Sequence, residues 1–188
     1  MRPIERSFFE RDPVLCAREL IGCTLGFGSA SGIIVETEAY AANGDHACHT
    51  WKRPSARKFV AFNSPGTAYV YLNYGMHWLF NFLVKGGDRD GFVLIRALEP
   101  VKGIPVMKRR RKQAELSMLC NGPAKLTQAL GIRGDLDGGN PLDMAGWTLL
   151  HPPTPVRISV STRIGISKAA GYPWRFLLHG SRFVSMPA

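Results

Sequence analysis

Residues 67–84 (TAYVYLNYGMHWLFNFLV) contain two runs of aromatic and β-branched side chains separated by a short polar turn. Such runs are typical of β-strands, and Asn73-Tyr74-Gly75 at the junction is the kind of sequence that tight hairpin turns favour. A further apolar run, FVLIRAL, follows at 92–98. Strands joined by so short a connection must pair antiparallel. The segment therefore commits the chain to an antiparallel sheet.

The N-terminal part adds one helix and two strands to this sheet. Asp12-Pro13 is a typical helix start, and the apolar pattern that follows ends at Gly22. The runs at 24–27 and 32–40 are β-like and are joined by a glycine-rich turn.

The rest of the chain predicts two helices and then more short strands. The pattern alone gives a helix over roughly residues 101–118, and Asn121-Gly122-Pro123 starts another that ends at Gly131. From Leu149 on, short β-type runs alternate with turns. A chain of 188 residues is long enough for one core. We therefore expect a single α+β domain spanning 1–188, with a mainly antiparallel sheet.

Composition excludes several classes of protein. No stretch approaches the roughly 20 apolar residues of a membrane span, and the N-terminus carries charges where a signal peptide needs an apolar run. We therefore expect a protein that is neither membrane-bound nor secreted. The scattered cysteines Cys16, Cys23, Cys48 and Cys120 predict reduced thiols in an intracellular compartment, not a disulfide framework.

Positive charge is strong and clustered. Twenty-four Lys and Arg against fourteen Asp and Glu give a net charge of +10. Residues 102–112 (KGIPVMKRRRK) carry six positive charges and no acid, and five Lys or Arg but no acid follow Asp143. Clusters of this kind suit a polyanion such as nucleic acid. For the KRRRK run alone, a solvated basic face or a localisation signal explains the charge equally well. A second group comprises Lys52, Arg53, Arg57 and Lys58.

Several strand positions place polar side chains on one face. Alternation along 32–40 puts Glu36, Glu38 and Tyr40 on the same side. Arg96 lies between apolar neighbours in FVLIRAL. A buried arginine needs a partner, and a glutamate of the earlier strand is the obvious one; alternatively, Arg96 lies at a sheet edge and reaches water.

If these faces converge, they form a pocket for a flat heteroaromatic ligand. Tyr40, Tyr71 and His49 would form its walls, and Asn81 and Arg96 its floor. Its acid/base group would be Glu36 or Glu38, and periodicity alone does not choose between them.

Metal and nucleophile motifs are absent from the sequence. The ligand types in 45–49 (DHACH) are too close together for three or four of them to reach one tetrahedral ion. The chain has no C-x-x-C pair and no G-x-S-x-G. We therefore expect no metal and no other cofactor.

Five motifs in order resemble one known family. The motifs are, in order, VETEAY with a histidine nine residues after its tyrosine, PGTAYVYLNYGMHWLFN, LIRALEP, LCNGPAKLTQALGI, and the closing RIGIS and PWRFLLHGSRFVS. They are similar to motifs of the alkyladenine (3-methyladenine) DNA glycosylases. The resemblance covers roughly residues 10–186. It implies the compact fold of that family, a curved sheet flanked by helices, with a protruding hairpin that inserts into DNA.

The resemblance also implies roles for individual residues. Glu38 would be the general base, and Arg96 would hold the water or an adjacent phosphate. Tyr74, at the hairpin tip, would fill the gap that the flipped base leaves. The flipped base would lie in a pocket of Tyr40, Tyr71, His49 and Asn81, with Asn81 excluding normal purines that carry an exocyclic amino group. Lys52, Arg53 and Lys125 would contact the DNA backbone, although an ordinary helix cap explains the segment around Lys125 equally well.

The chain departs from the family between His49 and Pro65. Here Arg57-Lys58 replaces the arginine-asparagine pair typical of the family, and Phe62 keeps only an aromatic position. We expect a loop at 50–64 that borders the pocket and affects substrate range more than catalysis. His77, where relatives often have an aromatic residue, receives no role.

The combined expectation is a monofunctional purine DNA N-glycosylase. It would act as a monomer on double-stranded DNA containing damaged purines, in the cytoplasm of a bacterium or the nucleus of a eukaryote. A non-catalytic module that binds damaged DNA through the same basic face and tyrosine is the alternative. An enzyme acting on free nucleosides would leave the net charge and Tyr74 unexplained.

Overall fold

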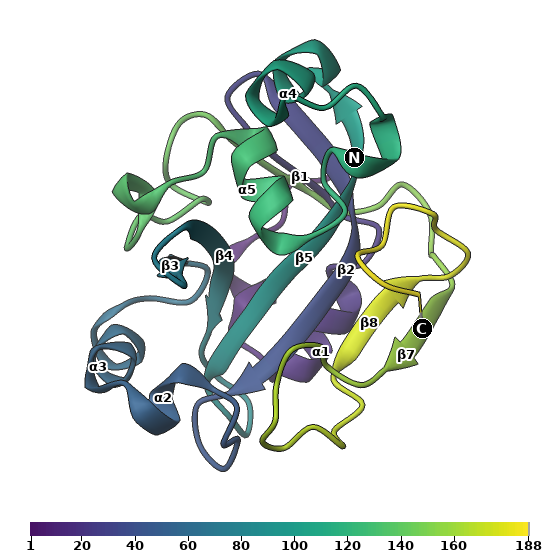
Figure 1. Cartoon of the computed structure of the whole chain (residues 1–188). Coiled ribbons are helices and arrows are strands. Elements are labelled where there is room, and N and C mark those ends of the chain that lie inside the picture. Colours follow the sequence, from purple (N-terminus) through teal and green to yellow (C-terminus); the bar gives the residue numbers. More distant parts are fainter. Residues whose placement is uncertain (188) are drawn as a thin grey trace.

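In the computed structural model, which describes residues 1–187, one curled antiparallel sheet forms the body of the protein (Figure 1). Its main path runs β3-β4-β5-β2-β1-β6, and β8 pairs with both β2 and β7. The α+β class and the antiparallel sheet are thus confirmed. The strands are β1 (Thr24–Phe27), β2 (Ala30–Ala41), β3 (Ala68–Asn73), β4 (His77–Val84), β5 (Gly91–Lys102), β6 (Trp147–Leu150), β7 (Ile158–Ser161) and β8 (Arg175–Leu178).

The hairpin of β3 and β4 matches the sequence prediction closely. Asn73 pairs with His77, and the backbone N–H of Met76 donates to the carbonyl of Asn73 over 3.1 Å. Tyr74 (φ 50°) and Gly75 (φ 70°) are both left-handed, as a tight turn that follows the twist of its strands requires. The turn therefore leaves the Tyr74 side chain at the tip.

The long strand β2 changes its neighbour along its length. Its first half pairs with β1, while Glu36, Thr37 and Glu38 pair with β8. The register against β5 shifts on both sides of Glu36. Such irregularities bend a strand and increase its twist. In this way Arg175 of β8 becomes the direct neighbour of Glu38.

Two of the predicted helices form as expected. In α1 (Pro13–Glu19), the Asp12 carboxylate accepts from the N–H of Val14 over 2.8 Å, so Asp12 is the N-cap. Helix α5 (Pro123–Leu130) ends at Gly131, whose φ of 81° gives a left-handed C-cap.

The single helix expected over 101–118 is wrong. Residues 101–102 extend β5, Gly103 turns the chain with φ 74°, and α4 covers only Ile104–Arg111. Lys112 then adopts a left-handed conformation (φ 48°), and a 3-10 turn, η2, follows at Leu116–Met118. The sequence pattern did not reveal that the helix ends at Arg111, because the basic run around this position contains few apolar residues to mark the end of a buried face.

The loop expected at 50–64 is also wrong. The segment forms α2 (His49–Lys52) and α3 (Pro54–Phe62). Pro54 starts α3, and Arg53 before it is extended, as residues before proline prefer. Ala56 and Val60, four residues apart, bury one face of α3, whereas Phe62 is exposed. Arg57 joins the two helices, because its Nη1 donates to the carbonyl of Thr50 over 2.7 Å. The remaining 3-10 turns are η1 (Arg6–Phe9) and η3 (Gly134–Leu136).

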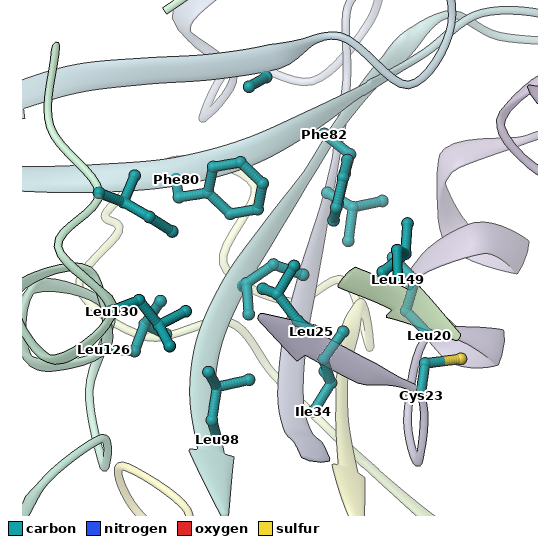
Figure 2. Close-up of a cluster of buried hydrophobic side chains, with 14 of the residues drawn as sticks. Leu20, Cys23, Leu25, Ile34, Phe80, Phe82, Leu98, Leu126, Leu130 and Leu149 are labelled. Atoms are coloured by element: carbon teal, nitrogen blue, oxygen red, sulfur yellow. The ribbon is translucent and has the colours of Figure 1, made fainter. Parts of the chain in front are cut away.

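The main core fills one face of the sheet (Figure 2). Phe80 and Phe82 of β4 point into it, together with Leu126 and Leu130 of α5 and Leu20 near the end of α1. Trp78 and Val84 belong to the same cluster, so alternate residues of β4 form one apolar face. The Thr37 hydroxyl donates to the carbonyl of Ala17 over 2.7 Å, which places α1 on this face of β2. The strand residues that alternate with these core residues point to the opposite face of the sheet, where the candidate site lies.

All four cysteines are buried free thiols. Among the helices of residues 1–187, none combines the length and apolar character needed to cross a membrane.

Candidate active site

A cavity of about 310 Å³ opens on the face of the sheet opposite the main core. Its wall comes from β2, β3, β4 and β5, from the start of α2, from Pro123 at the start of α5, and from the segment 164–166. Five of the seven residues expected in the pocket or its chemistry line it: Tyr40, His49, Tyr71, Asn81 and Arg96. The side chains that alternation places together therefore do meet in one cavity.

Glu38 lies immediately behind the cavity wall. Its carboxylate is fully buried, with Oε2 accepting from the Tyr40 hydroxyl over 2.7 Å and from Arg96 Nη1 over 3.1 Å. Oε1 accepts from the backbone N–H of Ile164 over 2.7 Å. All three donor residues line the cavity. Groups that line the cavity thus hold both oxygens of the Glu38 carboxylate.

Glu36 is equally buried, but of its partners only Arg96 lines the cavity. Its Oε1 accepts from Arg96 Nε over 3.0 Å and from Arg175 Nε over 2.8 Å. Its other contacts are with Ser185. Geometry thus distinguishes two glutamates that alternation could not, because every donor to Glu38 lines the cavity, whereas Arg175 and Ser185, which also bind Glu36, do not.

Arg96 connects the two carboxylates. The expected glutamate partner is confirmed, and the alternative of a sheet-edge arginine reaching water is wrong, because Arg96 is only 8% exposed. Burial alone lowers the pKa of Arg96, but the charges of Glu38 and Glu36 outweigh it and raise that pKa above the usual arginine value. Arg96 therefore stays a cation at the cavity wall.

His49 is uncharged at neutral pH. Burial, assisted by the charge of Arg53, lowers the pKa of His49 to about 4. One ring nitrogen, Nδ1, lies 3.1 Å from the Tyr69 hydroxyl, and the ring meets that of Tyr71 edge-on at 4.3 Å between centroids. A neutral imidazole can offer either a donor or an acceptor to a bound base.

The tyrosines of the cavity remain protonated. Burial raises the pKa of Tyr40 well above the usual tyrosine value, and the neighbouring Glu38 raises it further. Burial also raises the pKa of Tyr69 to about 12 and that of Tyr71 higher still. Tyr69, two residues before Tyr71 on β3, lines the cavity as well, and the sequence analysis did not place it there.

Arg163 is a buried cation that sequence reasoning missed. Its guanidinium forms an ion pair with Asp45, with Nη1–Oδ2 and Nη2–Oδ1 distances of 2.5 and 3.0 Å. It also lies over the ring of Tyr40, 4.7 Å from the centroid, and 5.1 Å from that of Trp174. Asp45 therefore fixes Arg163, which in turn packs against Tyr40 in the cavity wall. Residues 1–187 contain no group of three or more potential metal ligands. Pairing across 118 positions leaves no local signal in the sequence.

Comparison with known proteins places the chain in a family. The family model described as "Methylpurine-DNA glycosylase (MPG)" matches residues 7–182. The chain belongs to the methylpurine-DNA glycosylase family. The resemblance seen in the five sequence motifs is thereby confirmed.

Bacterial relatives in this family are similar over almost the whole chain. A protein of Rhodopseudomonas palustris is 49% identical over 98% of this chain and 88% of its own length. Proteins of Agrobacterium fabrum and Nitrosospira multiformis are 47% and 42% identical, over 97% and 95% of this chain and 92% of their own lengths. Each is named, as a provisional assignment, a 3-methyladenine DNA glycosylase. Membership indicates a DNA repair enzyme that hydrolyses glycosidic bonds and takes DNA as its substrate.

The tip of the β3–β4 hairpin lies at the edge of the cavity. Tyr74 lines the cavity, yet 85% of the residue is exposed, and Met76 next to the turn is 72% exposed. An aromatic side chain in this position has no core to join. The tip is therefore an apolar projection beside the site.

The basic residues expected to contact the DNA backbone differ in whether they already bind other side chains. Lys52 and Arg53 are exposed where α2 ends, and the Arg53 guanidinium lies 5.8 Å from the centroid of the Tyr71 ring. Lys125, in contrast, donates to Asn121 Oδ1 over 2.8 Å. Two of the five cations after Asp143, Arg163 and Arg175, are buried in ion pairs. These two cannot serve as surface contacts to a polyanion.

Proposed function

We propose that the protein is a monofunctional purine DNA N-glycosylase. It takes an alkylated or deaminated purine out of duplex DNA into the cavity and hydrolyses its N-glycosidic bond, leaving an abasic site. The observation that carries this proposal is the placement of Glu38, a fully buried carboxylate whose three hydrogen-bond donors all line an aromatic cavity.

The chemistry of the damaged base suits this site. A purine alkylated at N3 or N7 carries a positive charge, so the base is already a good leaving group. The faces of Tyr40 and Tyr71 offer the electron density that a flat cation prefers. The N-glycosidic bond then breaks through a transition state in which the sugar resembles an oxocarbenium ion. The reaction also requires a nucleophile.

Glu38 supplies the base that activates a water molecule. The carboxylate accepts the proton of the water while the water oxygen bonds to C1′ of the sugar, and the electrons of the C1′–N bond leave with the alkylated purine and neutralise its charge. A deaminated purine is neutral and must also take up a proton to leave as a free base. Arg96 stabilises the Glu38 carboxylate before the proton is transferred. Because water is the nucleophile, the product is a free base and an intact strand with an abasic site.

Two further residues decide what enters the cavity. Tyr74 takes the place of the flipped base in the duplex and offsets part of the few kcal/mol of unstacking. Asn81 is held by the hydrogen bond from its Nδ2 to the carbonyl of Tyr69, 3.1 Å long. In this position Asn81 limits the room for the exocyclic amino group of a normal purine.

The test compares base release by the wild type and by Glu38→Gln on methylated duplex DNA. Loss of the general base is expected to slow release by about 100- to 10,000-fold. Glutamine keeps the shape of Glu38 but removes one negative charge from a buried ion-pair group, so the melting temperature is measured as well. Folded Glu38→Gln should still bind the lesion duplex. Equal release by both proteins would assign the chemistry to another group. Binding without release by either protein would establish a damage-binding module instead.

A further inference from the structure

Glu36 is a second buried carboxylate that the proposed reaction does not use. It is fully buried on the same strand as Glu38, two residues away. Four donors from three residues converge on its two oxygens. A buried charge with so many partners holds other groups in place, and the identity of those groups indicates its purpose.

Two of these donors come from one residue near the C-terminus. The backbone N–H of Ser185 donates to Glu36 Oε2 over 2.5 Å, and the Ser185 hydroxyl donates to Oε1 over 2.8 Å. Arg175 binds Oε1 through Nε and also donates through Nη2 to the carbonyl of Met186. We call residues 183–186 the closing segment. Glu36 fixes this segment against the sheet.

The closing segment also has an apolar anchor. Phe183 is only 6% exposed and packs with Val35 and Ala97, which flank Glu36 and Arg96 in the sequence. The N–H of Phe183 donates to the Ser181 hydroxyl over 3.2 Å. The position of Ser185 is therefore set on one side by packing and on the other by the Glu36 carboxylate.

Arg96 lies between the closing segment and Glu38, and each of its side-chain nitrogens has a different partner. Nε donates to Glu36, Nη1 donates to Glu38 over 3.1 Å, and Nη2 lies 3.5 Å from the Ser185 hydroxyl. A guanidinium is planar and rigid, so fixing two of its nitrogens fixes the direction of the third. The nitrogen whose direction is fixed in this way is the one that binds the proposed general base.

We propose that Ser185 and Glu36 are positioning residues that hold Arg96, and through it Glu38, in the geometry needed for base release. This inference rests on the proposed function and assigns a role in it to the closing segment. Neither residue touches the cavity, so neither should contribute to recognition of the damaged base.

Ser185 offers a cleaner test than Glu36. Glu36 and Glu38 face the two guanidiniums of Arg96 and Arg175, so the buried group has balanced charge. Glu36→Gln would leave a buried cation uncompensated and destabilise the fold. Ser185→Ala removes the hydroxyl contacts with Glu36 and Arg96 but keeps the charges and the backbone N–H.

The experiment compares the wild type, Ser185→Ala and Ser185→Thr on duplex DNA with one methylated purine. Ser29→Ala is the matched control, because Ser29 is exposed in the turn between β1 and β2. Single-turnover base release, the dissociation constant for the lesion duplex and the melting temperature are measured for each. Ser185→Ala is expected to slow release about 5- to 30-fold, the effect of one or two hydrogen bonds.

The other measurements separate positioning from a merely structural role. The dissociation constant and melting temperature of Ser185→Ala should stay close to those of the wild type, and Ser185→Thr should restore most of the rate. Release by Ser185→Ala at the wild-type rate would overturn the inference alone. Parallel loss of rate, binding and melting temperature would overturn it in favour of a structural role. Absence of release by the wild type would overturn the proposed function and this inference together.

Discussion

Tyr74 has a backbone conformation that its side chain makes costly. Its φ of 50° is left-handed, which costs a residue other than glycine roughly 1–2 kcal/mol. Tyr74→Gly relieves this cost but makes the unfolded chain more flexible, so the free energy of unfolding should stay within about 1 kcal/mol of the wild type. If the tyrosine fills the space of the flipped base, affinity for lesion duplex should fall about 10- to 100-fold. Denaturant titration and a binding assay measure the two quantities.

Phe62 provides the matched control for Tyr74. It is also aromatic and also 85% exposed, but it lies at the end of α3 and does not line the cavity. Phe62→Gly should leave lesion binding within about twofold of the wild type, as expected for a side chain outside the hot spot. Similar losses in both variants would show that general apolar contact, not insertion at the tip, supports binding.

His49 should make the stability of the fold depend on pH. Its folded-state pKa of about 4 lies below the usual unfolded value of about 6.5, so the unfolded state binds the proton more tightly. The stability that depends on neutral His49 is complete above about pH 6.5 and is lost as the pH falls toward 4. After allowance for partial exposure, we expect a loss of about 1 kcal/mol between about pH 7.5 and pH 5.

His49→Gln isolates this contribution, because glutamine does not titrate. Its free energy of unfolding should vary less between those two pH values than that of the wild type, and an NMR titration of the wild type should show His49 uncharged at about pH 5.5. Protonation of His49 near pH 6.5, or the same pH dependence in both proteins, would contradict the expectation.

Individual residues show how far sequence reasoning reaches at this scale. The alternation of β2 and the apolar surroundings of Arg96 were sufficient to predict an ion pair with an early-strand glutamate. The choice of Glu38 over Glu36 came only from the family resemblance, because both side chains share a face. Arg163 and Asp45 could not be paired in advance, since their contact depends on where the segment after β7 returns to β2.

At the scale of the helices, α4 illustrates that a basic run can have structural as well as binding roles. Arg110 Nη1 donates to the carbonyls of Ala129 and Leu130 over 3.0 and 2.7 Å, where α5 leaves its last carbonyls without partners in the helix. Arg110→Ala should therefore lower the free energy of unfolding by about 1 kcal/mol. Urea denaturation measures this value.

Arg109 is the neighbouring control in the same helix. It is exposed, and Arg109→Ala should change the free energy of unfolding by less than about 0.5 kcal/mol. Equal destabilisation by the two substitutions would mean that loss of positive charge near the C-terminal end of α4, not loss of the cap on α5, accounts for the effect.

Element boundaries were predictable where turn residues mark them. Gly75 and Gly131 mark the ends of β3 and α5 well, because a left-handed turn ends regular structure whatever surrounds it. The segment 50–64 was mistaken for a loop because α2 is a single turn and Arg57-Lys58 interrupts the apolar pattern of α3. Pro54, with Ala56 and Val60 four residues apart, was the available signal.

At the scale of the whole molecule, the class of fold followed from the strand pattern, whereas the curved sheet was expected only from the family resemblance. Successive strands with short connections can only pair antiparallel, so that part followed from the sequence. The pairing of β8 with β2 joins segments about 140 residues apart, as in the register of Glu36 with Leu177 (Figure 1). No local pattern marks such a contact. That pairing brings Arg175 and the closing segment to Glu36, so the long-range topology assembles the buried charge group.

The net charge of +10 bears on binding by the whole molecule. If about five phosphates are neutralised, the logarithm of the binding constant for duplex DNA should fall with the logarithm of salt concentration with a slope of about −4.5. Raising salt from about 50 to 200 mM would then weaken binding about 500-fold. Base release from DNA that is already bound should change little, because the site is buried and poorly screened.

The salt slope also tests where the DNA lies. Lys52 and Arg53 are exposed beside the cavity, so replacing both by alanine should make the slope less steep by about 1.8. Arg18 is an equally exposed arginine, but α1 packs on the face of β2 opposite Glu38. Arg18→Ala should therefore leave the slope unchanged. If Arg18→Ala lowered the slope and the double variant did not, the DNA would lie on the α1 side, and the cavity could not receive a flipped base.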